Sequence, residues 1–193
     1  MQIGVLALQG DFREHIALLT ATGASAIEVR TEQQLAAVSG LVIPGGESTA
    51  ISKLMDIFGL LGPIRERILE GLPVLGTCAG LILLSDRVIG AGKGQHFVGG
   101  LPITVERNAY GSQLESFEYE IETPIGRQQV AFIRAPKIRS IDNPAVEVLA
   151  QLNGEPIAVR YGNVFGAAFH PELTGSVWLH ELFLTATKSY AAR

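Results

Sequence analysis

The chain has a single cysteine, Cys78, in the segment GTCAG at residues 76–80. An apolar run precedes this segment and a stretch of helical character follows it. A nucleophile on a tight turn between a strand and a helix needs small neighbours, and the two flanking glycines supply them. The N-terminus of the helix would favour the thiolate, which is the nucleophilic form of cysteine. We therefore predict a nucleophile at Cys78, with a buried small apolar residue as the alternative.

A histidine and a glutamate follow the apolar run 164–169 in the segment His170-Pro171-Glu172. A thiol nucleophile needs a base within hydrogen-bond distance, and the base needs an acceptor that orients it. Proline fixes its own φ angle, which suits holding the imidazole and the carboxylate in one relation. We predict that His170 is the base and that Glu172 orients it. A solvated loop histidine is the alternative for this segment taken alone.

A glycine-rich loop, PGGES at residues 44–48, follows another apolar run. Glycines after a strand let backbone N–H groups approach a ligand closely. In an acyl-transfer enzyme these groups, with the N–H of Ala79, can stabilise an oxyanion. The alternative is a plain strand-to-helix turn capped by Ser48. The loop lacks both GxGxxG and GK[ST], so a phosphate site is not favoured.

The remaining histidines are predicted to be structural or solvated. His15 and His180 fall on helical faces, and His96 lies in a glycine-rich loop. One cysteine is too few for a thiolate metal site, and the sequence shows no cluster of metal ligands. We therefore expect neither a metal nor a cofactor.

The predicted chemical groups are far apart in the sequence, so the fold must bring them together. The first half of the chain alternates short apolar runs with amphipathic stretches, as in a parallel sheet covered by helices. We expect strands at residues 3–8, 26–29, 41–43 and 73–76. We expect helices from Phe12 to a C-cap at Gly23, from a capping box at 31–34, from Ser48 as N-cap to about Phe58, near Pro63, and from Ala79 to about Arg87.

The sequence pattern of the second half of the chain predicts strands with few helices. These strands are expected at residues 100–107, 116–122, 129–134, 146–152 and 164–169. Asn153-Gly154 between two apolar runs is typical of a type I′ hairpin turn. A C-terminal helix is expected to bury Trp178, Leu182 and Thr185, with Leu179 and Phe183 beside them. Together the two halves predict one α/β domain over residues 1–193, with a mostly parallel central sheet and an antiparallel extension.

The composition excludes several classes of protein. Of the 193 residues, 47% are hydrophobic and 18% charged, which excludes a disordered chain. The net charge of −4 favours neither a nucleic acid nor an anionic membrane as partner. The longest apolar run, residues 74–84, is shorter than the ~18 residues that a membrane-spanning helix needs. The single cysteine indicates the reducing cytoplasm.

Taken together, GTCAG, PGGES and HPE resemble the class I glutamine amidotransferases. Four further segments narrow the resemblance to the glutaminase subunits of pyridoxal 5′-phosphate synthase, the PdxT family; they are GVLALQG at 4–10, ERN at 106–108, SFE at 116–118 and FIRAP at 132–136. The likeness extends from Ile3 to the C-terminal helix. It implies a three-layer, flavodoxin-like class I glutamine amidotransferase fold.

The resemblance also implies roles for individual residues. Cys78 would attack the side-chain amide of L-glutamine, His170 would act first as base and then as acid, and Glu172 would orient His170. The oxyanion would be held at Gly46 and Ala79. The residues that match the family's glutamine-binding positions are Gly46, Glu47, Ser48, Arg107, Ile133 and Arg134. Ser112 departs from the family pattern, because arginine is expected there.

The resemblance implies that the chain hydrolyses L-glutamine to L-glutamate and ammonia through a γ-glutamyl thioester. A separate PdxS-type synthase subunit would receive the ammonia in a hetero-oligomeric complex and build pyridoxal 5′-phosphate. Two alternatives stay open from the sequence. One is another hydrolase with a cysteine elbow, peptidase-like or deglycase-like, and the other is a non-catalytic interaction subunit.

Overall fold

A seven-stranded sheet forms the centre of the computed structural model, which describes residues 1–107 and 116–192. Its strand order is β10-β11-β12-β4-β3-β1-β2. The strands are β1 (Gln2–Leu6), β2 (Ser25–Val29), β3 (Gly40–Ile43), β4 (Val74–Thr77), β10 (Glu147–Leu152), β11 (Glu155–Tyr161) and β12 (Val164–Ala167). The five strands from β12 to β2 are parallel, whereas β10 and β11 extend the sheet antiparallel at the β12 side. The predicted sheet, mostly parallel with an antiparallel extension, is confirmed.

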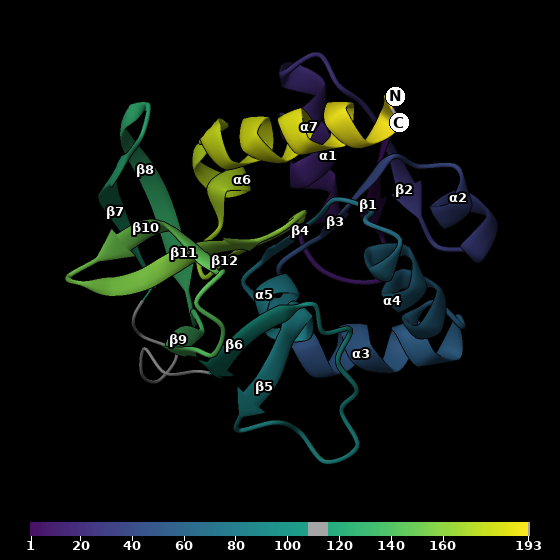
Figure 1. Ribbon diagram of the computed structural model, residues 1–193, viewed down its shortest axis with the longest axis horizontal. Helices are drawn as coiled ribbons and strands as arrows, with labels where there is room; N and C mark the ends of the chain where they lie inside the picture. The colour runs from purple at the N-terminus through teal and green to yellow at the C-terminus, as the bar shows by residue number, and fades with distance from the viewer. Residues whose placement is uncertain (108–115, 193) are drawn as a thin grey trace.

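Helices cover both faces of this sheet and complete three layers. Figure 1 shows α1 and α7 on one face and α3, α4 and α5 on the other. The helices are α1 (Phe12–Ala21), α2 (Glu32–Ala36), α3 (Ser48–Ile57), α4 (Leu61–Leu69), α5 (Ala79–Leu84), α6 (Pro171–Thr174) and α7 (Trp178–Ala191). The central strands β3 and β4 are buried along their whole length, as their apolar runs predict. The parallel order β2-β1-β3-β4-β12 is that of the flavodoxin-like folds.

Two smaller sheets lie beside the central one. β5 (Ser85–Ile89), β6 (Leu101–Glu106) and β9 (Lys137–Ile141) form a three-stranded sheet. β7 (Ser116–Thr123) and β8 (Gly126–Ile133) form an antiparallel hairpin. A single bridge between Ala131 of β8 and His170 joins this hairpin to the segment after β12. The hairpin backbone therefore lies against the predicted base.

Two local predictions are confirmed by backbone geometry. Thr31 and Gln34 form the predicted capping box at the start of α2. Asn153 and Gly154 turn from β10 into β11 with φ angles of 53° and 80°, as a type I′ turn requires.

Other local predictions were wrong. Glu47, not Ser48, caps α3, because its carboxylate accepts the backbone N–H of Ala50 at 2.8 Å. Helix α5 ends at Leu84 instead of continuing to Arg87, because residues 85–89 pair with β6 as strand β5. Strand β9, which pairs with β6 on its other side, was not expected.

The buried face of α7 differs from the predicted one. Trp178, Leu179 and Phe183 are buried as expected, but Leu182 and Thr185 are exposed. His180 takes their place in the interior and is 0% exposed. Within the described ranges, no helix has the length and apolar character needed to cross a membrane.

Candidate active site

Cys78 lies on a sharp turn between β4 and α5. Its φ angle of 47° is rare for a residue with a side chain and is typical of a strained functional position. The turn is held because the Cys78 N–H donates to the Ala167 carbonyl of β12 at 2.8 Å. A Cβ atom on Gly76 would collide with Gly80, and one on Gly80 would collide with the Ile43 carbonyl. Small residues are therefore required on both sides of the cysteine.

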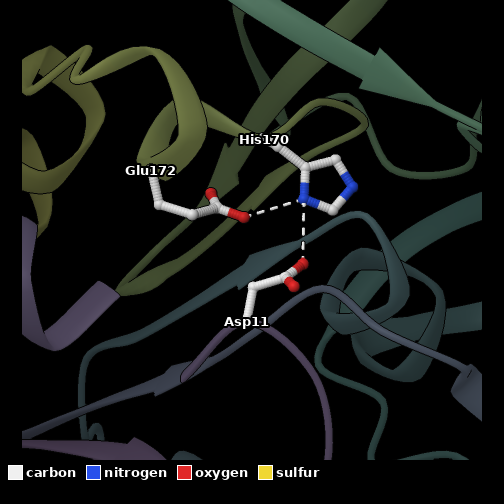
Figure 2. Close-up of side chains that lie close together, drawn as sticks. All are labelled: Asp11, His170 and Glu172. Atoms are coloured by element: carbon white, nitrogen blue, oxygen red, sulfur yellow. Dashed lines mark hydrogen bonds and ion pairs between the residues drawn. The ribbon is translucent and has the colours of Figure 1, made fainter. Parts of the chain in front are cut away.

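His170 follows β12, and its Nδ1 atom lies 2.7 Å from Oε1 of Glu172 (Figure 2). The Asp11 carboxylate, from the loop after β1, lies 3.4 Å from the same nitrogen. The His170 backbone N–H donates to the Ala131 carbonyl at 2.8 Å, which fixes the main chain as well. Because Nδ1 is occupied by carboxylates, Nε2 is the nitrogen left for Cys78.

The surroundings of His170 favour its charged form. Burial by itself lowers the pKa of His170, but hydrogen bonds with the side chains of Asp11, Cys78 and Glu172 raise it to about 12. At neutral pH the imidazole is therefore an imidazolium. Such a group beside a cysteine stabilises the thiolate. The base therefore carries a proton beside Cys78 that it can pass on.

A cavity of about 400 Å³ opens above Cys78 and His170. This volume is in the range of small-molecule sites in proteins. Eight of the predicted site residues line it; they are Gly46, Glu47, Ser48, Cys78, Arg107, Ile133, Arg134 and His170. Glu172 does not line the cavity because it lies behind His170, and Ala79 begins helix α5. The fold thus brings the predicted residues from five separate segments to one place.

Opposite charges meet at one wall of the cavity. Arg107 donates to the Glu47 carboxylate at 3.1 Å and to the side-chain oxygen of Gln95 at 2.9 Å. Gln95 in turn donates to the Ser48 hydroxyl at 3.1 Å. Partial burial raises the pKa of Glu47. Hydrogen bonds to its carboxylate, including that from the Ala50 backbone, and the charge of Arg107 outweigh this effect, so the pKa is lowered overall. The wall therefore carries one fixed cation and one fixed anion, which match the two charges of a free amino acid.

The loop after β1 packs tightly against the PGGES loop. The Gln9 side chain accepts the Glu47 N–H at 2.8 Å, and the Asp11 N–H donates to the Gly45 carbonyl at 3.1 Å. Gly10 lies so close to Gly45 that a Cβ atom would collide with the Gly45 carbonyl. The two loops therefore form one unit. This contact fixes the backbone at Gly46, one of the two predicted oxyanion positions.

The second predicted oxyanion donor is the backbone N–H of Ala79. Ala79 is the first residue of α5, where backbone N–H groups have no partner within the helix. The N–H is therefore free to bind a ligand beside Cys78. The oxyanion role of Gly46 and Ala79 stays a prediction.

Sequence reasoning missed Asp11 and Gln95 as parts of the site, whereas the Gln9-Gly10 loop is expected at the sheet edge of the PGGES loop from its place after the first strand, and it lies there. Asp11 follows β1, and the carboxyl ends of parallel strands share one edge of a sheet, so its position was a usable signal. Gln95 lies in a loop without a motif, and no sequence signal points to it. Ser112, where the resemblance implies arginine, lies outside the described residues.

Comparisons with known proteins agree with this geometry. The model of the SNO glutamine amidotransferase family matches residues 5–189. The pyridoxal 5′-phosphate synthase subunit PdxT of Streptomyces avermitilis is 50% identical over 190 residues, covering 97% of this chain and 94% of that relative. The PdxT subunit of Leifsonia xyli subsp. xyli is 50% identical over 187 residues, covering 95% and 94%.

Solved structures give the same result. A crystal structure of a glutamine amidotransferase superposes with a TM-score of 0.91 at 45% identity, covering 96% of this chain and 98% of that one. A glutamine amidotransferase of Thermotoga maritima has a TM-score of 0.59 at 15% identity, covering 100% of this chain and 92% of that one, and it shares the fold. The chain belongs to the SNO glutamine amidotransferase family.

Proposed function

We propose that the chain hydrolyses L-glutamine to L-glutamate and ammonia at Cys78, and that it supplies the ammonia to a synthase subunit that makes pyridoxal 5′-phosphate. The observation that carries the proposal is the arrangement of Cys78, His170 and Glu172 at a cavity with a fixed pair of charges. Family membership supports the reaction and argues against the peptidase-like and deglycase-like alternatives.

The first half of the reaction uses the thiolate–imidazolium pair. The Cys78 sulfur attacks the amide carbon of glutamine and forms a carbon–sulfur bond, while the carbonyl oxygen becomes an oxyanion. Backbone N–H groups at Gly46 and Ala79 stabilise that oxyanion. His170 then gives its Nε2 proton to the amide nitrogen, the carbon–nitrogen bond breaks, and ammonia leaves. A γ-glutamyl thioester remains on Cys78.

The second half of the reaction restores the resting site. Neutral His170 accepts a proton from a water molecule, whose oxygen attacks the thioester carbon. The carbon–sulfur bond breaks, glutamate is released, and Cys78 leaves as a thiolate beside the imidazolium of His170. Glu172 stabilises that imidazolium through its 2.7 Å contact with Nδ1. One glutamine and one water give one glutamate and one ammonia.

The charged wall of the cavity explains why a free amino acid is the substrate. The Arg107 guanidinium suits the α-carboxylate of glutamine, and the Glu47 carboxylate suits its α-ammonium group. Ser48, Ile133 and Arg134 complete the lining. Arg107 and Glu47 lie 3.1 Å apart and hold each other in place, so the two charged groups of the substrate meet two groups that are already positioned.

The partner follows from the product and from the relatives. Ammonia released into water at neutral pH becomes ammonium, which is not a nucleophile, so a biosynthetic glutaminase needs a neighbour that takes up the ammonia directly. The relatives that match over nearly their whole length are pyridoxal 5′-phosphate synthase subunits. A PdxS-type synthase subunit in a hetero-oligomeric complex is therefore the proposed partner. The nucleophile must also stay reduced, which supports a cytoplasmic location for the reaction.

Ammonia release tests the proposal. The purified chain, with and without its synthase subunit, is titrated with L-glutamine, and glutamate and ammonia are quantified. We expect equal amounts of both products and no hydrolysis by Cys78→Ala. A wild-type complex that does not hydrolyse glutamine would contradict the proposal, as would an equal rate with asparagine or a peptide substrate.

A further inference from the structure

Two fully buried histidines lie behind the triad and take no part in the reaction described above. His15 comes from α1 and His180 from α7, and both are 0% exposed. Neither lines the cavity. Nδ1 of His15 lies 2.9 Å from Nε2 of His180. Nε2 of His15 lies 3.0 Å from the Thr77 hydroxyl and 3.4 Å from Oε2 of Glu172.

The position of the protons follows from which atoms lack partners. Nδ1 of His180 is buried and has no hydrogen-bond partner in the described part of the chain. A proton on this atom would be a buried donor without an acceptor, which is costly. The proton of His180 therefore belongs on Nε2, where it is donated to Nδ1 of His15. As a consequence, neutral His15 carries its own proton on Nε2.

That proton is donated to the Thr77 hydroxyl at 3.0 Å, and the same nitrogen lies 3.4 Å from Oε2 of Glu172, on the side of the carboxylate that His170 does not use. Oε1 of Glu172 contacts His170, whereas Oε2 is buried and lacks any partner of standard hydrogen-bond geometry among the described residues. The reverse arrangement, with the proton of His15 on Nδ1, would place a nitrogen lone pair against the carboxylate oxygen. This arrangement of protons pairs His180 with His15 and leaves the polar Nε2–H of His15 beside Oε2 of Glu172.

We propose that His15 is a positioning residue for this reaction: its Nε2–H, bonded to Thr77, holds Glu172 in line with His170 through the 3.4 Å electrostatic contact with Oε2, and His180 fixes His15 in the required tautomer. The proposal rests on the proposed function. It extends the line of contacts from Cys78 through His170 and Glu172 to His15 of α1 and His180 of α7.

The charge state of His15 suits this role. Burial first, and then the neighbouring His180 and His170, lower the pKa of His15 well below 6.5, so it is neutral at neutral pH. A neutral donor orients Glu172 without neutralising it. Burial raises the pKa of Glu172, whereas the hydrogen bond with His170 and the charge of His170 lower it, so the imidazolium of His170 favours the ionised carboxylate. A charged residue at this position would compete with His170 for the same carboxylate.

Steady-state glutamine hydrolysis by the complex with the synthase subunit tests the proposal. His15→Phe keeps a ring of similar size without an N–H, and His15→Gln restores an N–H near the position of Nε2. We expect His15→Phe to lower kcat about tenfold or more, since the buried Glu172 carboxylate loses the polar group 3.4 Å from Oε2, with KM within about twofold of wild type. We expect His15→Gln to recover most of kcat. A wild-type kcat in His15→Phe, or no recovery in His15→Gln, would overturn the proposal.

Controls separate positioning from loss of stability. Thr187→Val changes a buried hydroxyl on α7 that bonds to the Phe183 carbonyl, away from the triad, and should leave kcat unchanged. If His15→Phe does not fold, the kcat values of His180→Phe and His180→Gln test the proposal instead. Of these two variants, only His180→Gln can donate a hydrogen bond to His15. Equal kcat values for these two would overturn the proposal. A wild-type complex without glutaminase activity would instead refute the proposed function.

Discussion

His180 should make the stability of the protein fall steeply in mild acid. Burial lowers the pKa of His180 to about 4 in the folded chain, from an ordinary value of 6.5. In the unfolded chain the imidazole is solvated, so it binds a proton as the pH falls through 6.5 while the folded chain does not. Protonation therefore favours the unfolded state. The stability contributed by neutral His180 is complete near pH 7 and is lost progressively between pH 6.5 and 4.

The size of this effect follows from the two pKa values. They differ by 2.5 units, from 6.5 to about 4. One unit corresponds to ~1.4 kcal/mol, so the free energy of unfolding should fall by about 3 kcal/mol between pH 7 and pH 4 through this group. His180 is fully buried, so solvent screening does not reduce this figure. For a protein with a typical stability of ~5–15 kcal/mol, such a loss is large.

A comparison of two proteins isolates the contribution of His180. His180→Gln keeps a donor toward His15 but does not titrate, and every other ionisable group is common to both chains. Urea unfolding is followed at several pH values by far-UV circular dichroism and by the fluorescence of Trp178, the only tryptophan. Wild type should lose about 3 kcal/mol more than His180→Gln from pH 7 to pH 4. Thr187→Val should run parallel to wild type. Parallel curves for wild type and His180→Gln would refute the reasoning.

Three further predictions concern the triad. Cys78→Ala should abolish glutamine hydrolysis while leaving the circular dichroism spectrum unchanged, because the turn accepts small side chains; hydrolysis at the wild-type rate would show that another residue is the nucleophile. His170→Ala should lower kcat by orders of magnitude, because it removes the base. Glu172→Gln should lower kcat by an equal or smaller factor, since the glutamine weakens support for the imidazolium without removing the base. A larger loss in Glu172→Gln than in His170→Ala in a kinetic assay would mean that the roles are misassigned. Asp11→Asn should lower the pKa of His170 from about 12, because it removes one of the groups that hold the imidazolium, and a ¹⁵N-histidine NMR titration with an unchanged midpoint would count against this role of Asp11.

The parts of the site that the sequence predicted are those whose chemistry imposes a local pattern. A nucleophile on a tight turn needs glycines at fixed spacing, so the segment around Cys78 could be found by inspection. The buried strands β3 and β4 could be recognised in the sequence as apolar runs between turn residues. The loop at 44–48 was found for the same reason, because its glycines directly follow a strand.

The remaining features depend on contacts that no local pattern encodes. Helix α5 ends at Leu84 because the next residues find a partner strand beginning at Leu101, and the apolar run itself gives no sign of this. The contact between His15 and His180 joins residues that are 165 positions apart. On α7, His180 is buried instead of Leu182, because that face of the helix meets His15 of α1 as well as the apolar core.

The order of strands in the central sheet has a consequence for synthesis of the chain on the ribosome. The nucleophile lies after β4, but β12, which pairs with β4, is made about ninety residues later, at Val164–Ala167. Until then one edge of β4 is unpaired, and neither the base nor its carboxylate has been made. An unfinished chain therefore cannot consume glutamine. Pairing over such a long separation in sequence is intrinsically slow. We therefore expect the active site to form late in folding, after synthesis of β12.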